Sequence, residues 1–196
     1  MDNGDIIFKG KSIKGQPFHK IANLRIARTF QNLELFGNLT SIENIMVGMY
    51  RKNQKGFLSS GFMIIGINKK IIEKSLSILE YINLSHRTNE IAKNLPIGEQ
   101  RLLEVGRALS TDPDLILLDE PAAGLNMRET KNLSQVIQKI RDEKGITILI
   151  IDHDMELVME ISDIITVLNF EEVIAEGEPL MIQRNLQVIS AYLGAD

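Results

Sequence analysis

The chain of 196 residues contains no cysteine, and it also lacks an excess of positive charge, since its formal net charge is −4. The absence of cysteine excludes disulfide bonds and cysteine-ligated zinc sites, and it is typical of a reducing compartment. General nucleic-acid binding needs a basic surface, which an acidic chain does not supply. We therefore expect no nucleic-acid partner.

Long apolar runs are also missing. Residues 1–20 mix acids, lysines and glycines, which is unlike a signal peptide. The most apolar segment, residues 56–67 (GFLSSGFMIIGI), is too short for a membrane span, which needs about 20 residues. At a membrane, such a chain is expected to work as a peripheral subunit. Segment 56–67 either packs within its own helical region or meets a helix of a membrane subunit.

Apolar residues make up 44% of the chain, enough to build a core. Three short apolar runs, at 115–118 (LILL), 146–151 (ITILII) and 164–168 (IITVL), predict strands buried on both faces. Helical patterns at 127–144 and 154–161 separate them. Alternation of strands and helices predicts a parallel α/β sheet.

The expected helix at 127–144 has clear signals at both ends. Asn126 can cap it, Glu129 stands where a capping box requires an acid, and Gly145 can end it. Its apolar residues at helical spacing are Met127, Leu133, Val136, Ile137 and Ile140.

The middle of the chain has a different pattern. Residues 40–43 (TSIE) form another capping-box signature, which predicts a helix to about Met49. A second helix is expected over 69–83, with one apolar face that consists of Ile71, Ile72, Leu76, Leu79 and Ile82. We expect no strand between residues 40 and 95. A short strand is expected at 5–9 (DIIFK), and a last helix at 185–193, stopped by Gly194.

Two adjacent carboxylates follow the first of the apolar runs. Asp119 and Glu120 come directly after LILL, so they are delivered to the carboxyl edge of the sheet, where α/β proteins bind ligands. One carboxylate can hold Mg²⁺, which prefers oxygen ligands and keeps its waters. The other can orient an attacking water. Taken alone, the pair is equally consistent with a strand that ends in solvated acids.

Three further signals are weak when each is taken by itself. Residues 95–101 (LPIGEQR) lead into a helix to about Leu109, and Gly98 there allows close approach of a ligand to the backbone. His153 follows the ITILII run and could contact a phosphate, although a lone histidine is more often a satisfied polar residue. Gln31, within RTFQN, stands where the α/β pattern gives way to helices.

The order of these signals is specific. Gln31, a helical insert, LPIGEQR, LILLDEP, residues 123–126 (AGLN) and His153 after a strand follow one another. This series resembles the ATP-binding cassette (ABC) ATPases over nearly the whole chain, where the motifs are called the Q-loop, signature, Walker B, D-loop and H-loop. The resemblance implies a P-loop NTPase (RecA-like) ABC cassette of α/β class with a helical subdomain. Its three parts would be residues 1–31, the remainder of an N-terminal α/β portion; residues 32–95, the helical subdomain; and residues 96–196, the C-terminal α/β portion.

The resemblance also implies roles for particular residues. Asp119 would be the Mg²⁺-associated acid, with Gln31 as a sensor of metal and water. Glu120 would be the catalytic carboxylate and His153 the γ-phosphate contact. The remaining expected contacts to nucleotide are Gln31, Ile97, Gly98, Glu99 and Asn126. ATP and Mg²⁺ are the implied cofactors, and a second cassette and membrane permease subunits are the implied partners, together with a substrate-binding protein that acts indirectly.

Further motifs indicate a branch of the family. RTFQN, TSIEN, PAAGLN, DHDM and the ending AYLG are similar to the cassettes of leucine/isoleucine/valine importers. We therefore expect an ATPase on the inner face of the cell membrane that powers import of branched-chain amino acids. The alternatives are a cassette for another cargo, such as lipopolysaccharide export, and a non-catalytic truncated partner cassette. A cassette protein acting on ribosomes or DNA is disfavoured by the acidic charge.

The chain departs from the family pattern at two places. The phosphate-binding P-loop, G-x-x-x-x-G-K-[ST], is missing, because Gly4 and Gly10 are separated by five residues and not four. We interpret Gly10–Ser12 as a turn and expect the P-loop and its strand upstream of Met1. Without that central strand, its neighbours are expected to have exposed edges beside a gap in the core. The second departure is Pro96 followed by Ile97, where the signature usually has serine and glycine.

Overall fold

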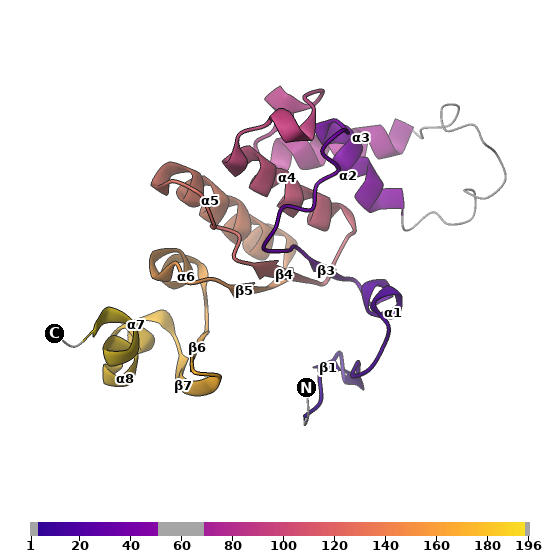
Figure 1. The fold of residues 1–196 in the computed structure, drawn as a ribbon. Helices are drawn as coiled ribbons and strands as arrows, with labels where there is room; N and C mark the ends of the chain where they lie inside the picture. Colours follow the sequence, from indigo (N-terminus) through magenta and orange to yellow (C-terminus); the bar gives the residue numbers. More distant parts are fainter. Residues whose placement is uncertain (1–3, 51–68, 195–196) are drawn as a thin grey trace.

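The computed structural model describes residues 4–50 and 69–194 (Figure 1). The apolar segment 56–67 lies outside the described residues, so neither interpretation of it is tested. Within those residues, no helix is both long enough and apolar enough to cross a membrane.

A parallel sheet organises the centre of the molecule. It consists of β3 (Ile26–Arg28), β4 (Leu115–Asp119) and β5 (Thr147–Ile151), in the order β3-β4-β5. Ile26 pairs with Leu115, and Asp119 pairs with Ile151. The strands predicted at 115–118 and 146–151 are confirmed. Their connection is α5 (Met127–Lys144), a helical crossover of the kind that parallel strands need.

The third predicted strand does not join this sheet. β6 (Ile165–Asn169) pairs antiparallel with β7 (Glu172–Gly177) in a separate hairpin. The prediction of a parallel partnership for residues 164–168 is therefore wrong in this structure. An apolar run indicates that a strand forms but does not indicate its partner, and the two-residue connection at Phe170 and Glu171, both with positive φ, favours a hairpin.

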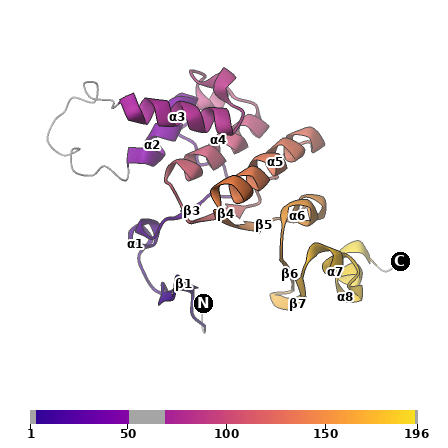
Figure 2. The same cartoon turned by 180° about the vertical axis from the view of Figure 1, so that it is seen from behind.

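Burial on both faces is also wrong for β5. Leu149 is 55% exposed and Ile151 62% exposed, whereas Ile116 and Leu118 of β4 are buried. Figures 1 and 2 show the reason, because helices α2 (Ser41–Tyr50), α3 (Lys69–Tyr81), α4 (Ile97–Ser110) and α5 lie on one side of the sheet. A cleft of about 840 Å³ separates the uncovered part of β5 from β6.

The middle of the chain is helical, as predicted. α2 and α3 pack with α4, and two short 3₁₀ turns, η1 (Ser85–Arg87) and η2 (Ala92–Asn94), connect α3 to α4. Between residues 40 and 95, the described part contains only one isolated β-bridge, from Thr40 to Ile91. Close packing of α2 on α4 depends on Gly48, where an added Cβ would lie 2.7 Å from the carbonyl oxygen of Arg107.

One residue of the predicted apolar face of α3 is misplaced. Leu76 is 42% exposed, whereas Ile78, Leu79 and Ile82 are buried. The buried face is centred near Ser75 and Ile78, and Leu76 lies at its margin because successive residues turn by about 100°.

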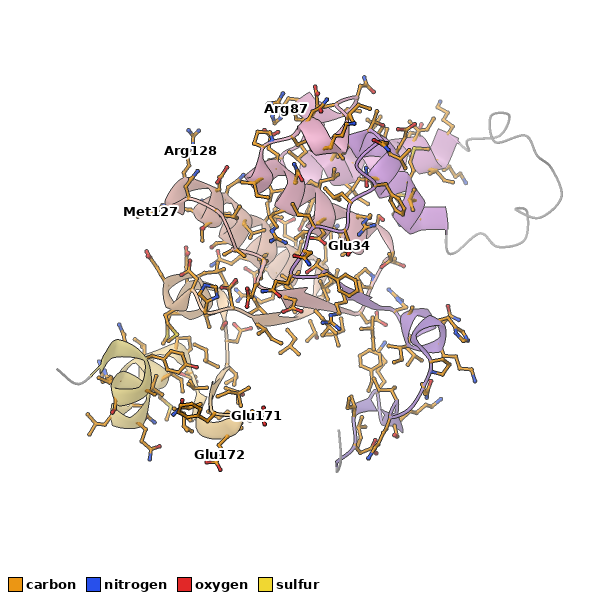
Figure 3. All side chains as sticks on the ribbon, viewed as in Figure 1. Glu34, Arg87, Met127, Arg128, Glu171 and Glu172 are labelled. Atoms are coloured by element: carbon orange, nitrogen blue, oxygen red, sulfur yellow. The ribbon has the colours of Figure 1, made fainter. Side chains whose placement is uncertain are left out.

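The predicted signals at helix ends are confirmed. At α5, the Asn126 side chain accepts from the backbone N–H of Glu129, Glu129 accepts from the N–H of Asn126, and Gly145 is left-handed at φ 61°. At α2, Glu43 accepts from the N–H of Thr40 at 2.7 Å. Of the apolar residues named at helical spacing in this helix, Met127 is not part of the core, since it is 84% exposed at the outer end of α5 (Figure 3).

The N-terminal part begins with a hairpin of β1 (Ile7–Phe8) and β2 (Lys11–Ser12). The turn predicted at Gly10–Ser12 is displaced by one residue, because Lys9 and Gly10 have the positive φ angles of a two-residue hairpin loop and Lys11–Ser12 is strand. α1 (Phe18–Asn23) leads from the hairpin to β3.

The C-terminal part contains α6 (Met155–Ile161), the β6–β7 hairpin and two short helices. α6 agrees with the helix predicted at 154–161. α7 is Pro179–Gln183 and α8 is Leu186–Ile189. The single helix predicted over 185–193 is shorter, because α8 continues as a π-helical turn, η3 (Ser190–Gly194). Asn185 caps α8, since its side chain accepts from the N–H of Gln187 at 2.9 Å.

Candidate functional site

The candidate site begins at the carboxyl ends of the parallel strands. Because β3, β4 and β5 run in the same direction, Gln31, Asp119, Glu120 and His153 all lie at or just beyond one edge of the sheet. We call these four residues the sheet-edge group. Loops at this edge are where parallel α/β sheets place ligands.

Gln31 and Glu120 are in direct contact. The Nε2 of Gln31 donates to the Oε2 of Glu120 at 3.0 Å. Glu120 has a φ of 44°, a left-handed conformation that is strained for a residue with a side chain and is concentrated at functional sites. The neutral amide of Gln31 and the carboxylate of Glu120, which are 89 positions apart in sequence, are therefore held together.

Asp119 is paired with a cation from the neighbouring strand. The Oδ2 of Asp119 lies 3.0 Å from a guanidinium nitrogen of Arg28, and the Arg28 guanidinium lies over the ring of Phe30 at 5.0 Å. The pair is partly exposed, with side-chain exposures of 51% for Arg28 and 29% for Asp119. The Asp119 carboxylate is therefore partly exposed, and the guanidinium of Arg28 neutralises its charge.

His153 is less tightly integrated than the other three residues. Its side chain is 78% exposed, its Nδ1 lies 3.8 Å from Asp152, and among the described residues it makes no hydrogen bond with Glu120 or Gln31. The buried Asp152 carboxylate instead connects the two loops, because it accepts from the N–H groups of Ala122 at 3.2 Å and Asp154 at 2.9 Å.

The other predicted residues lie where α4 and α5 begin. Ile97, Gly98 and Glu99 form the first turn of α4, and Asn126 caps α5. We call these four residues the helix-end group. An added Cβ on Gly98 would lie 2.8–2.9 Å from the side-chain carbons and Oε1 of Glu129, so the glycine allows the capping carboxylate of α5 to rest against α4. A hollow of about 580 Å³ adjoins both helix starts.

Glu99 is fixed by the 3₁₀ turn η1. Its carboxylate accepts from Arg87 Nε at 3.0 Å and lies 3.2 Å from His86 Nε2. The N-cap of α4, Pro96, has no side-chain hydrogen bond to the helix, which is the physical consequence of proline in place of serine.

The donor set fits a magnesium ion that is shared with a nucleotide. Among the described residues, no group of three or more His, Cys, Asp or Glu side chains could hold a metal by itself. Mg²⁺ commonly binds through one or two carboxylates, waters and substrate phosphates, and Asp119 with the Gln31 amide supplies that kind of incomplete set.

Several residues at the site were not singled out from the sequence. Arg28, Arg101 and Asp152 stood only within quoted motifs, and Glu104 was not named at all. Arg101 and Glu104 contact the segment around Gln31. Position at a strand end was an available signal for Arg28 and Asp152. No sequence signal indicated the burial of Arg101 and Glu104.

Comparison with family models gives two matches. Residues 1–123 match the model described as ABC transporter. Residues 172–196 match the model described as branched-chain amino acid ATP-binding cassette transporter.

Individual relatives agree with these matches. The chain is 43% identical to the "High-affinity branched-chain amino acid transport ATP-binding protein BraF" of Pseudomonas aeruginosa, over 97% of this chain and 76% of that protein. It is 40% identical to LivG of Escherichia coli, a protein of the same description, over the same shares. Among solved structures, the ADP conformation of MJ1267, an ATP-binding cassette of an ABC transporter, superposes with a TM-score of 0.81 at 30% identity, over 99% of this chain and 78% of that chain.

Proposed function

Because the chain belongs to the ABC transporter family, we propose that it is the ATP-binding subunit of an importer for branched-chain amino acids. The match of residues 172–196 to the branched-chain cassette model supports this cargo, as does the likeness to BraF and LivG. These matches do not indicate lipopolysaccharide export, the competing cargo.

In this proposal the sheet-edge group acts at the γ-phosphate. Glu120 polarises the attacking water, and the Gln31 amide holds the Glu120 carboxylate in place through its 3.0 Å hydrogen bond. His153, exposed at the end of β5, is free to turn toward a phosphate oxygen. Asp119 and Gln31 would hold Mg²⁺, which when bound neutralises charge on the phosphates.

The helix-end group would serve a second cassette. Ile97, Gly98 and Glu99 present the first turn of α4, and Asn126 presents the start of α5, away from direct contact with Glu120. The N-cap of α4 makes no side-chain hydrogen bond, so the first N–H groups of α4 can attract an anion. We propose that these residues meet a nucleotide held mainly by the partner cassette, so that two cassettes share each ATP.

Location and partners complete the proposal. The subunit would lie on the inner face of the cell membrane and contact permease subunits, while a substrate-binding protein delivers the amino acid to them. Residues 32–95 would act as the helical subdomain between an N-terminal portion, residues 1–31, and a C-terminal portion, residues 96–196.

The contact between Gln31 and Glu120 carries the catalytic proposal. It joins an amide to the carboxylate of a residue with a strained backbone, at the edge of the sheet where ligands bind. The test is steady-state ATP turnover of the assembled transporter with Glu120→Gln. Loss of a catalytic base typically lowers turnover by about 10²–10⁴-fold. Unchanged turnover would remove Glu120 from its role, and Glu160→Gln on α6 provides a matched control at an exposed acid.

A second candidate function is non-catalytic, because Gly10–Ser12 do not form a phosphate loop in the described part of the chain. Gly10, Lys11 and Ser12, the residues most similar to a phosphate loop, lie in the β1–β2 hairpin and not at the start of a helix. In this second candidate function, the chain completes the ATP site of an intact cassette. Mg-ATP-dependent pairing with an intact cassette, together with turnover that survives Glu120→Gln, would favour it.

A further inference from the structure

The charged pair Arg101–Glu104 on α4 is almost completely buried. The side chains are 7% and 3% exposed, and the Arg101 NH1 lies 3.5 Å from the Glu104 Oε2. Burial raises the pKa of Glu104, while backbone N–H groups of the 30–34 segment and the charges of Arg101 and Arg107 act in the opposite direction. A buried ion pair is a weak source of stability because desolvation offsets its attraction, and Arg101 Nε has no hydrogen-bond partner. A contribution to stability therefore does not explain why this charged pair is buried at this position.

Both members of the pair hold the segment that carries Gln31. Arg101 NH2 donates to the carbonyl oxygen of Gln31 at 2.9 Å, and its NH1 donates to that of Phe30 at 3.4 Å. Glu104 Oε1 accepts from the N–H of Glu34 at 3.5 Å. Figure 3 shows Glu34 on the chain segment that passes between α4 and the sheet.

This segment has little support of its own. Residues 29–36 form neither helix nor strand, and Gln31, Asn32 and Glu34 are exposed. The planar guanidinium of Arg101 reaches the carbonyls of two successive peptide groups, those of Phe30 and Gln31. A lysine ammonium cannot reproduce this contact as a fork. The backbone position of Gln31 is therefore set by α4.

We propose that Arg101 and Glu104 are positioning residues that clamp the backbone of residues 30–34 to α4, so that the Gln31 amide meets Glu120. Arg101 lies one turn after Ile97–Glu99 on the same helix, so the clamp joins the helix-end group rigidly to the sheet-edge group. The functional meaning of this link rests on the proposed ATPase role, whereas the clamp itself is a property of the resting chain.

The experiment uses the ¹⁵N-labelled full chain without nucleotide, with Arg101→Met compared to the unsubstituted protein. The first readout is the resonance of the Gln31 side-chain amide, assigned by its loss in Gln31→Ala. The second is the backbone order parameter of residues 30–34. We expect the amide resonance to move toward its position in urea, and the order parameters to fall from about 0.85, typical of rigid backbone, to below about 0.6.

The matched control is Arg141→Met. Arg141 also donates from a helix to a backbone carbonyl, that of Ile161 at 2.7 Å, but it lies on α5, contacts the end of α6 and does not contact residues 30–34. The control should leave both readouts unchanged. A folded Arg101→Met protein in which neither readout moves would overturn the clamp.

Where Arg101→Met does not fold, Arg101→Lys serves in its place, because it keeps the charge and loses the fork. A shifted Gln31 resonance in the lysine variant supports the proposal, and an unshifted one overturns it. Because neither readout depends on ATP, failure of the clamp is distinguishable from failure of the proposed ATPase role, which only the Glu120→Gln turnover assay tests.

Discussion

Replacement of Gly98 by alanine should have opposite effects on stability in two backgrounds. In the unsubstituted protein, the new Cβ would lie 2.8 Å from Cγ and 2.9 Å from Cδ of Glu129. Those atoms belong to a flexible side chain, so we expect the carboxylate to move away. Its movement breaks the 3.0 Å hydrogen bond that it accepts from the N–H of Asn126.

The magnitude follows from two opposing contributions. A hydrogen bond to a charged group contributes about 1.5–3 kcal/mol, and an exposed position such as this one favours the lower end. Alanine is better than glycine in a helix by about 1 kcal/mol. The net loss in the unsubstituted protein is therefore about 0.5–1 kcal/mol. In a Glu129→Ala background no carboxylate is displaced, so Gly98→Ala should stabilise by up to about 1 kcal/mol.

Urea unfolding of the four proteins in this double-mutant cycle measures the effect. We expect a coupling of roughly 1.5–2 kcal/mol between the two sites, which is large compared with the additivity of independent sites. An equal effect of Gly98→Ala in both backgrounds would show that the close contact with Glu129 does not explain the glycine.

Three further expectations concern the core and the titrating groups. Leu103→Ala, at a fully buried position, should lower the free energy of unfolding by about 2–5 kcal/mol. Leu149→Ala, at a 55% exposed position, should change it by about 0.5 kcal/mol or less. Urea unfolding compares the two variants, and equal losses would contradict the burial pattern. Burial raises the pKa of Tyr81 to about 12, so a titration followed by tyrosinate absorbance should lose its most alkaline component in Tyr81→Phe. The backbone N–H and hydroxyl of Thr40 lower the pKa of Glu43 below 4.5, so the stability due to Glu43 is present above pH 4.5 and is lost as the pH falls through the lowered pKa. Glu43→Gln should flatten the dependence of the free energy of unfolding on pH in this acidic range. An unchanged slope would argue against the capping box.

Features with local causes could be predicted from the sequence. α5 begins and ends where its capping box and left-handed glycine indicate, because these signals act within a few residues of the chain. The strand ending in Asp119 and Glu120 was predicted for the same reason, since a continuous apolar run followed by acids is a local pattern. β3, β7, α1 and α7 were not predicted, because each is three to six residues long and presents too few positions to establish a period.

Features that depend on distant partners could not be read in the same way. The sequence placed Gln31 and Glu120 in one site only through the order of the motifs, and the 3.0 Å contact between them needs the pairing of β3 with β4. Arg101 and Glu104 have the composition of a solvated helix face, and only the packing of residues 30–34 on α4 buries them. A cleft separates β5 from β6, and the expectation of a gap left by an upstream strand stays a prediction.

That cleft has a consequence for how the chain behaves in solution. Among the described strands, β5 pairs only with β4 and β6 only with β7, so two rows of backbone donors and acceptors border the same apolar surface, which includes the exposed Leu149, Ile151 and Leu168. An unpaired strand edge beside apolar side chains is a template for any extended segment that meets it. An extended segment that inserts at this surface would pair with the free edges of β5 and β6 among the described strands, and it would cover Leu149, Ile151 and Leu168 at the same time.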